Sequence, residues 1–183
     1  MKEETIMKVW WTSDTHYGAN RTLELSRRPF SSTEEMDNHM VEMYNKLVQP
    51  DDICYHLGDF GNYDMVKYLN GKVILIMGNY ERKDCELNFN NDINTFKKYL
   101  MDKGFYNVYE NYSWYKDYKM VHEPSKHSKN HFTLFGHIHR AMQVKKFGLN
   151  VGVDCNHFRP IDLETVRFFE TAIKQHYDSE VFD

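Results

Sequence analysis

The sequence predicts an α/β fold in a single domain, and three observations support this prediction. Short β-branched and aromatic runs alternate with segments of helical periodicity through the first half of the chain. The second half carries several more strand-like runs close together. Several runs end beside an Asp, Asn or His, at the strand ends where α/β sheets place their binding sites. The 183 residues suit one domain with a substantial core, so residues 1–183 are expected to form one unit.

The first half supplies three strands and two helices. Ser32 opens a Ser-Thr-Glu-Glu helix start, and Met36, Met40 and Met43 follow at helical spacing, so these methionines are expected in the core. Apolar and β-branched runs predict the strands. In order, we expect a strand over residues 8–13, a helix from Ser32 that ends before Pro50, a strand over 53–57, a short helix over 64–69, and a strand over 73–77.

The second half is richer in strands. Helical spacing predicts one helix over residues 93–101 and an amphipathic helix over 162–177 at the end. Aromatic and β-branched runs between them predict strands. These strands are expected over residues 106–109, 114–115, 119–122, 132–135 and 149–153.

Seven His, Asp and Asn side chains occur in short motifs beside glycines or at expected strand ends. They are Asp14 and His16 in SDTH, Asp59 in HLGDF, Asn79 in MGNYE, His122 in VHEP, and His137 and His139 in FGHIH. Two divalent cations about 3.5–4 Å apart need a bridging carboxylate and neutral ligands that add no further charge. Asp59 is the natural bridge, and Asn79 offers an amide oxygen. The residue types therefore predict a two-metal site.

This ordered set resembles the calcineurin-like metallophosphoesterase superfamily, in particular a small bacterial and phage branch. The family pattern is D-x-H, G-D, G-N-H-[DE], H and G-H-x-H, and the match runs from Ser13 to His139. The resemblance implies a four-layer αββα sandwich of two packed mixed sheets. It also implies one metal held by Asp14, His16, Asp59 and His139, and a second held by Asp59, Asn79, His122 and His137.

The resemblance further implies a metal-dependent phosphoesterase, a hydrolase in which a hydroxide bridging the two ions attacks phosphorus. Metal binding makes such a nucleophile available at neutral pH by lowering the pKa of water to about 7. The mixed nitrogen and oxygen ligands suit two divalent ions, with manganese favoured and iron, zinc, nickel or cobalt as alternatives.

The third motif departs from the family pattern. It reads Gly78-Asn79-Tyr80-Glu81, so Tyr80 stands where the family places a histidine credited with protonating the leaving oxygen or contacting the phosphate. A phenol is a weaker proton donor than an imidazolium, and general acid catalysis contributes on the order of 10²–10⁴-fold. A cyclic nucleotide, or a phosphodiester with a stabilised leaving group, depends less on a missing acid and is therefore expected to be favoured over an alkyl phosphomonoester. Asn79, Tyr80 and His122 are the candidate catalytic residues.

Two basic residues are candidates for substrate binding. Arg28 precedes Pro29 near the first motif, and its guanidinium suits bidentate contact with a phosphate; a surface ion pair is the alternative. His127 lies in the polar stretch after His122 and could meet an anionic substrate or supply a replacement acid. An ordinary solvated loop is the alternative for this stretch.

Two other functions stay open. A metal-containing module that binds a phosphoanion or nucleotide with little turnover would keep the same ligands without the acid. A nuclease would need a basic face, and the net charge of −4 disfavours nucleic acid as a partner. The expected partner is a small phosphorylated substrate, for which a nucleotide is one candidate.

Composition predicts a cytoplasmic protein that does not enter a membrane. The start, MKEETIMKVWW, has no apolar leader segment. Cys54, Cys85 and Cys155 show no disulfide or metal spacing and are expected to be reduced. The tyrosines and tryptophan between residues 106 and 118 are expected to fill the core or a homodimer face, with stacking on a nucleobase as the alternative.

Overall fold

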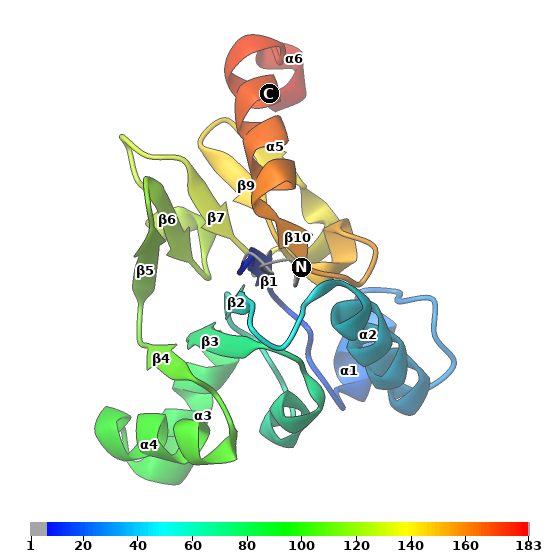
Figure 1. The fold of residues 1–183 in the computed structure, drawn as a ribbon, viewed down its shortest axis with the longest axis vertical. Helices are drawn as coiled ribbons and strands as arrows, with labels where there is room; N and C mark the ends of the chain where they lie inside the picture. Colours follow the sequence, from blue (N-terminus) through cyan, green and yellow to red (C-terminus); the bar gives the residue numbers. More distant parts are fainter. Residues whose placement is uncertain (1–6, 183) are drawn as a thin grey trace, which may run out of the picture.

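Two five-stranded mixed sheets form the centre of the protein in a computed structural model that describes residues 7–182 (Figure 1). The first sheet has the order β10-β1-β2-β3-β4, with β10 antiparallel and the others parallel. Its strands are β1 (Val9–Thr12), β2 (Ile53–His56), β3 (Lys72–Ile76), β4 (Asn107–Tyr109) and β10 (Ile161–Asp162).

The second sheet has the order β5-β6-β7-β9-β8. Its three central strands are parallel, and its two edge strands are antiparallel to their neighbours. The strands are β5 (Tyr112–Tyr115), β6 (Tyr118–Val121), β7 (Thr133–Phe135), β8 (Val144–Lys145) and β9 (Gly148–Asn150).

Six α-helices and four short 3₁₀ helices complete the described part of the chain. The α-helices are α1 (Asn20–Leu25), α2 (Thr33–Leu47), α3 (Asn79–Phe89), α4 (Ile93–Lys103), α5 (Leu163–Gln175) and α6 (Ser179–Phe182). The 3₁₀ helices are η1 (Tyr63–Tyr68), η2 (Pro124–Lys126), η3 (His139–Ala141) and η4 (Val153–Cys155). Within residues 7–182, no helix is long and apolar enough to cross a membrane.

One core lies between the first sheet and the helices that cover its outer face. Ser32 caps α2 by accepting a hydrogen bond from the Glu35 amide, as the helix-start sequence predicts. Met36 and Met40 then face the sheet and are fully buried beside Trp10, which confirms them as core residues. Side chains of α3, α4 and η1 extend the same core.

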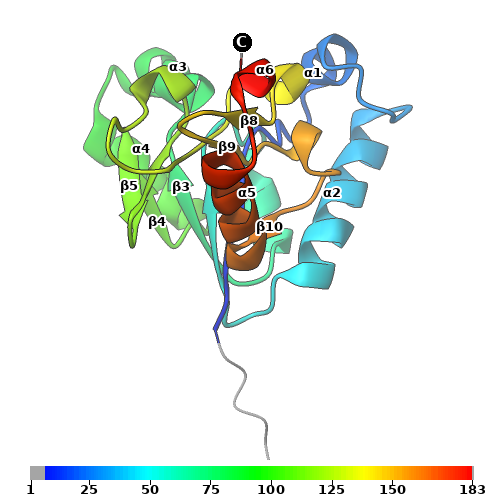
Figure 2. The same ribbon diagram turned by 90° about the horizontal axis from the view of Figure 1, so that it is seen from above.

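A second core fills the space between the two sheets. Trp11 and Ile76 from the first sheet pack with Leu134 and Leu149 from the second. Helix α5 runs beside β8, β9 and β10 and buries Val166 in this core (Figure 2). The two apolar faces of the first sheet follow from the alternation along β1, where Trp10 and Trp11 point to opposite sides.

The predicted architecture of two packed mixed sheets with helices is confirmed. Helix α3 lies where we expected no helix, and the two-residue strands β8 and β10 and the short helix α1 are also additions. Cys54, Cys85 and Cys155 are free cysteines, as expected. The expectation of no leader segment concerns residues 1–6, which lie outside the described residues, as does residue 183.

Candidate active site

The site forms where strands of both sheets end. Asp14, Asp59 and Asn79 follow β1, β2 and β3, while His122 and His137 follow β6 and β7. Backbone hydrogen bonds tie the first two loops together: the Asp14 amide donates to the Gly58 carbonyl at 3.0 Å, and the His16 amide to the Asp59 carbonyl at 3.0 Å. The two sheets meet here because the His137 amide donates to both carboxylate oxygens of Asp14, at 3.0 and 2.9 Å.

Two glycines allow this close approach. A Cβ atom on Gly58 would lie 2.5 Å from the Gly78 amide nitrogen and 2.8 Å from His122 Nδ1, and the φ of Gly58 is +95°. A Cβ atom on Gly78 would collide with the Asp59 carboxylate. Both positions therefore require glycine.

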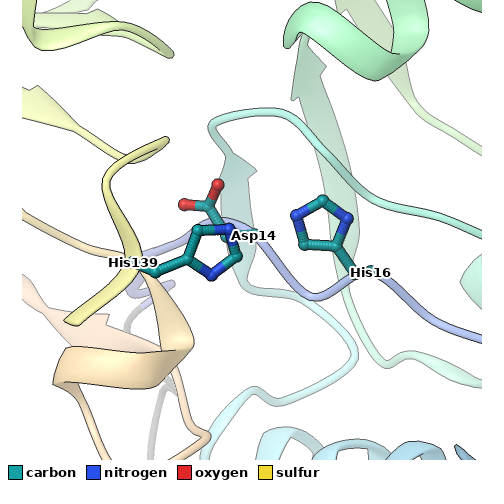
Figure 3. A group of neighbouring side chains, drawn as sticks. All are labelled: Asp14, His16 and His139. Atoms are coloured by element: carbon teal, nitrogen blue, oxygen red, sulfur yellow. The ribbon is translucent and has the colours of Figure 1, made fainter. Parts of the chain in front are cut away.

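The first group of donor atoms comes from Asp14, His16 and His139. These atoms lie within 4.8 Å of one another, and Figure 3 shows the three side chains as neighbours. The His16 and His139 rings stack with centroids 5.2 Å apart. Burial lowers the pKa of His16 to about 4, so its imidazole is neutral at pH 7. His16 Nε2 is buried and has no hydrogen-bond partner among residues 7–182, which fits a ligand atom for a metal.

The second group comes from Asn79, His122 and His137. Asn79 Oδ1 lies 2.9 Å from His122 Nε2 and 3.0 Å from His137 Nδ1, and these two nitrogens are 3.2 Å apart. Two ligands at right angles around an ion, with bonds of about 2.1 Å, are about 3.0 Å apart. The three donor atoms therefore have the mutual spacing of ligands to one metal ion.

Asp59 lies between the two groups. Its Oδ2 is 3.6 Å from His16 Nε2 and 3.4 Å from His122 Nε2, one nitrogen from each group. Its Oδ1 accepts a hydrogen bond from the Tyr80 amide at 3.0 Å. Burial raises the pKa of Asp59, but the hydrogen bond with His122 and the charge of His122 lower it further than burial raises it. The carboxylate is thus ionised, and one of its oxygens lies near a nitrogen of each donor group.

The backbone fixes which nitrogen of His122 faces the site. Nδ1 lies 2.7 Å from the Leu57 carbonyl, which only accepts, so Nδ1 donates and Nε2 is left for the cluster. Burial lowers the pKa of His122, but the hydrogen bond to Asp59 and the charges of Asp14 and Asp59 more than offset it and raise the pKa to about 9. The carboxylates around His122 therefore favour positive charge at this position.

Asp154 orients His139, and sequence reasoning missed it. Its Oδ2 lies 2.7 Å from His139 Nδ1, which leaves Nε2 of that ring for a metal. Burial raises the pKa of Asp154, but hydrogen bonds from His139 and Arg28 hold it at about 2. The one available signal was the NVGVD sequence, where an ionisable residue follows a buried strand.

The structure corrects the role expected for Arg28. Its side chain is fully buried and forms a bidentate pair with Asp154, at 3.0 and 2.9 Å. Its remaining donors reach the Asp14 carbonyl at 2.6 Å, the Thr15 carbonyl at 2.7 Å and the sulfur of Met36. All of its N–H groups are therefore committed inside the protein, and Arg28 holds the first motif rather than a substrate.

Glu81 is a second residue whose role sequence reasoning missed. Its fully buried carboxylate accepts hydrogen bonds from the amides of Gly78, Asp59 and Phe60, at 2.7 to 2.8 Å. Burial and the charge of Asp59 raise its pKa. Glu81 therefore joins the second and third motifs through backbone contacts, and its place at the end of the third motif was the available signal.

Five of the seven predicted ligands have a left-handed backbone. The φ angles are +58° at Asp14, +49° at His16, +56° at Asp59, +72° at His137 and +47° at His139. This conformation is uncommon for residues other than glycine and costs about 1–2 kcal/mol per residue. Such strain concentrates at functional sites, where surrounding contacts hold it in place.

Of the two remaining candidate residues, Tyr80 lies beside a predicted ligand and His127 does not. Tyr80, at the start of α3, is partly exposed, and its ring meets the His16 ring edge-on with centroids 4.9 Å apart. Its hydroxyl lies 3.2 Å from Arg21 Nη1. His127 is exposed and stacks on Phe147 with centroids 3.8 Å apart, and its described contacts do not include the seven ligands.

Comparisons with known proteins give a family match and a similar fold. Residues 7–156 match the family model described as the calcineurin-like phosphoesterase superfamily domain. An uncharacterized protein of Methanocaldococcus jannaschii is 25% identical over 170 residues, which cover 88% of this chain and 90% of that protein. A crystal structure of a protein of unknown function from Aquifex aeolicus has a similar fold, with a TM-score of 0.64 and 19% identity over 89% of this chain and 99% of that chain.

Proposed function

Because the chain belongs to the calcineurin-like phosphoesterase superfamily, we propose that it is a two-metal phosphoesterase that hydrolyses a phosphodiester or a cyclic nucleotide. The observation that carries this proposal is the position of Asp59, whose Oδ2 lies 3.6 Å from His16 and 3.4 Å from His122. One carboxylate oxygen within reach of both donor groups is what a bridging ligand provides.

The donor set supports divalent ions of intermediate hardness, with manganese as the first choice. Asp14, His16, Asp59 and His139 would hold one ion, and Asp59, Asn79, His122 and His137 the other. Two bound ions would supply charge neutralisation at the phosphoryl oxygens and a lowered pKa for water. The protein's own part is to orient the ligands, through Asp154 at His139 and the Leu57 carbonyl at His122.

Tyr80 supports the preference for a substrate with a good leaving group. Its ring meets His16 edge-on, so the phenol stands beside the first donor group. The hydroxyl can donate a hydrogen bond to a phosphoryl oxygen or to a leaving oxygen, but it releases a proton less readily than an imidazolium. Substrates whose leaving group departs without full protonation are therefore expected to react faster than alkyl phosphomonoesters.

The test is hydrolysis of matched substrates by protein that has been stripped of metal and reloaded with manganese. The substrates are an aryl phosphomonoester, an aryl phosphodiester and a 2′,3′-cyclic nucleotide. Asp59→Asn and His122→Ala remove ligands, and Asp117→Asn is a control because Asp117 is exposed in the turn between β5 and β6. Turnover of the diesters that is lost in the first two variants and kept in the control supports the proposal. No turnover despite two bound ions would favour a phosphoanion-binding module instead.

A further inference from the structure

A cleft of about 680 Å³ opens beside the first donor group. Six of its lining residues define what we call the cationic cleft: His16, Arg21, Arg27, Tyr80, His139 and Arg140. No Asp or Glu among the residues that the structure describes lines it. The volume suits a ligand of nucleotide size. The cleft therefore brings two predicted metal ligands and three arginines to one surface.

The three arginines are available to an anion. Arg21, Arg27 and Arg140 are exposed, and within residues 7–182 the arginines that form salt bridges are Arg28 and Arg82. A guanidinium without a carboxylate partner keeps its N–H donors for a ligand such as a phosphate. This local positive charge stands out in a chain with a net charge of −4.

Tyr80 lies between the first donor group and the arginines of the cationic cleft. Its ring lies against His16 with centroids 4.9 Å apart, and its hydroxyl accepts a hydrogen bond from Arg21 Nη1 at 3.2 Å. The family places its leaving-group histidine at this position of the third motif. The arginines therefore lie on the side of the site from which a leaving group would depart.

We infer that the cationic cleft binds the leaving group and that this leaving group is itself a phosphate, so the preferred bond is the P–O–P bond of a diphosphate. This inference rests on the proposed function. Suitable substrates are nucleoside diphosphates and diphosphates that join two nucleosides. A phosphate leaving group also explains why the site can work with Tyr80 in place of a stronger general acid. A phosphate monoester has a second pKa of about 6, so it departs as an anion without a proton from the protein.

Water is the only co-reactant in this step. For a diphosphate joining two adenosines, the water oxygen forms a bond to one phosphorus and the bond from that phosphorus to the bridging oxygen breaks. The bridging oxygen keeps the electron pair and leaves as part of one AMP. The attacked phosphorus becomes the second AMP, and the excess proton goes to solvent. The arginines stabilise the charge that develops on the leaving phosphate.

The first test compares two substrates that differ in the leaving group. Diadenosine diphosphate leaves a phosphate, and the dinucleotide ApA leaves a ribose hydroxyl. The manganese-loaded protein should prefer the diphosphate in kcat/KM. Arg21→Gln, Arg27→Gln and Arg140→Gln should each reduce that preference by about 10- to 100-fold, since charged hydrogen bonds are strong. Arg167→Gln, on exposed surface of α5, is the matched control. An unchanged preference in all three variants would overturn the inference.

A binding measurement tests the cleft without turnover. Titration calorimetry with α,β-methylene-ADP, which cannot be hydrolysed at its bridge, should show about 10-fold weaker binding in each of the three arginine variants than in the parent or Arg167→Gln. Equal affinity in all of them would contradict the inference, as would tighter binding of an RNA oligonucleotide than of the analogue. Specific binding without any hydrolysis would keep the cleft and reject the proposed function. Hydrolysis of ApA but not of diadenosine diphosphate would support the proposed function and reject the inference about the cleft.

Discussion

Asp154 lies 2.7 Å from Nδ1 of His139, and the same carboxylate is bound by the buried guanidinium of Arg28. His139 is exposed enough to turn, with a quarter of its side chain accessible, whereas the carboxylate of Asp154 is fully buried. The buried pair therefore fixes the orientation of a predicted ligand at the edge of the site. A histidine whose other ring nitrogen is held this way binds metal in a defined direction.

Asp154→Asn should weaken metal binding at the first donor group. An amide gives a weaker hydrogen bond to His139 and leaves Arg28 without its charge partner, and loss of such a partner typically reduces metal affinity about 10- to 100-fold. Titration of the metal-free protein with manganese measures this directly. Asp117→Asn is the control. If Asp154→Asn binds manganese at both donor groups as tightly as the parent does, Asp154 does not position His139.

Tyr80→His should raise activity on poor leaving groups. An imidazolium at this position restores a general acid, so kcat for an alkyl phosphomonoester should rise by on the order of 10²-fold or more, with a smaller change for an aryl ester. Steady-state kinetics on the two ester types measure the difference. Tyr106→His, at an exposed tyrosine of the first sheet's edge, is the matched control. If Tyr80→His and the parent are equal on the alkyl ester, proton transfer is not limiting.

Arg28→Met should destabilise the fold rather than weaken substrate binding. It removes the guanidinium that pairs with the buried carboxylate of Asp154, which then keeps only its contact with His139, and it leaves two carbonyls without donors. Together these losses cost roughly 3–5 kcal/mol of unfolding free energy. Arg159→Met, at an exposed arginine, should change stability by about 0.5 kcal/mol or less. Urea unfolding compares them. Equal stabilities, with a raised KM in Arg28→Met, would restore the substrate role.

Glu81→Gln should loosen the link between the second and third motifs. The amide offers one oxygen where the carboxylate uses two to accept three backbone hydrogen bonds, so at least one buried N–H is left without its partner. The expected loss is about 1–3 kcal/mol of unfolding free energy. Glu86→Gln, on the exposed face of the same helix, is the control and should be close to neutral. Similar losses in both variants would argue against this role.

Acid should destabilise the protein through His56. Burial, with a smaller contribution from His122, lowers the pKa of His56 from 6.5 to about 3. Between these values the unfolded chain binds a proton that the folded protein does not, so stability is present above pH 6.5 and falls as the pH decreases, by up to about 1.4 kcal/mol per pH unit.

His56→Gln removes this titration, so its unfolding free energy should fall less steeply with decreasing pH. Glutamine can keep a hydrogen bond to Thr15, which His56 Nε2 meets at 3.0 Å. Urea unfolding of metal-free protein, at several pH values between about 7 and 5, gives the change of unfolding free energy with pH for the parent and for the variant. Parallel slopes for the parent and the variant would contradict the assignment.

The sequence predicted the site best where a residue of a metal-binding type directly follows a predicted strand. All seven predicted ligands lie in the two donor groups or bridge them, because each follows a strand whose end is set by its apolar run. The burial of Met36 and Met40 followed from helical spacing in the same way. Local pattern was enough in these cases, since neighbouring strand ends meet at one edge of a sheet.

Other features depended on contacts between distant segments. Helix α3 has the sequence NYERKDCELNF, in which only Glu81 and Cys85 are buried. It therefore lacks the apolar stripe from which a helix is predicted. Arg28 looked like a phosphate ligand because its partner Asp154 is 126 residues away. No local pattern shows that a guanidinium turns inward to a carboxylate and two carbonyls that the fold brings to it.

The left-handed backbone of the ligands has a consequence for the evolution of this chain. At His16 and His139, glycine would relieve strain that every other residue keeps, so a glycine variant should be more stable than the alanine variant by about 1 kcal/mol, the reverse of the usual order. Replacing either histidine with glycine would therefore remove a predicted metal ligand at a smaller cost in stability than replacing it with alanine. Under selection for folding alone, glycine would thus be favoured over alanine wherever these two histidines are lost.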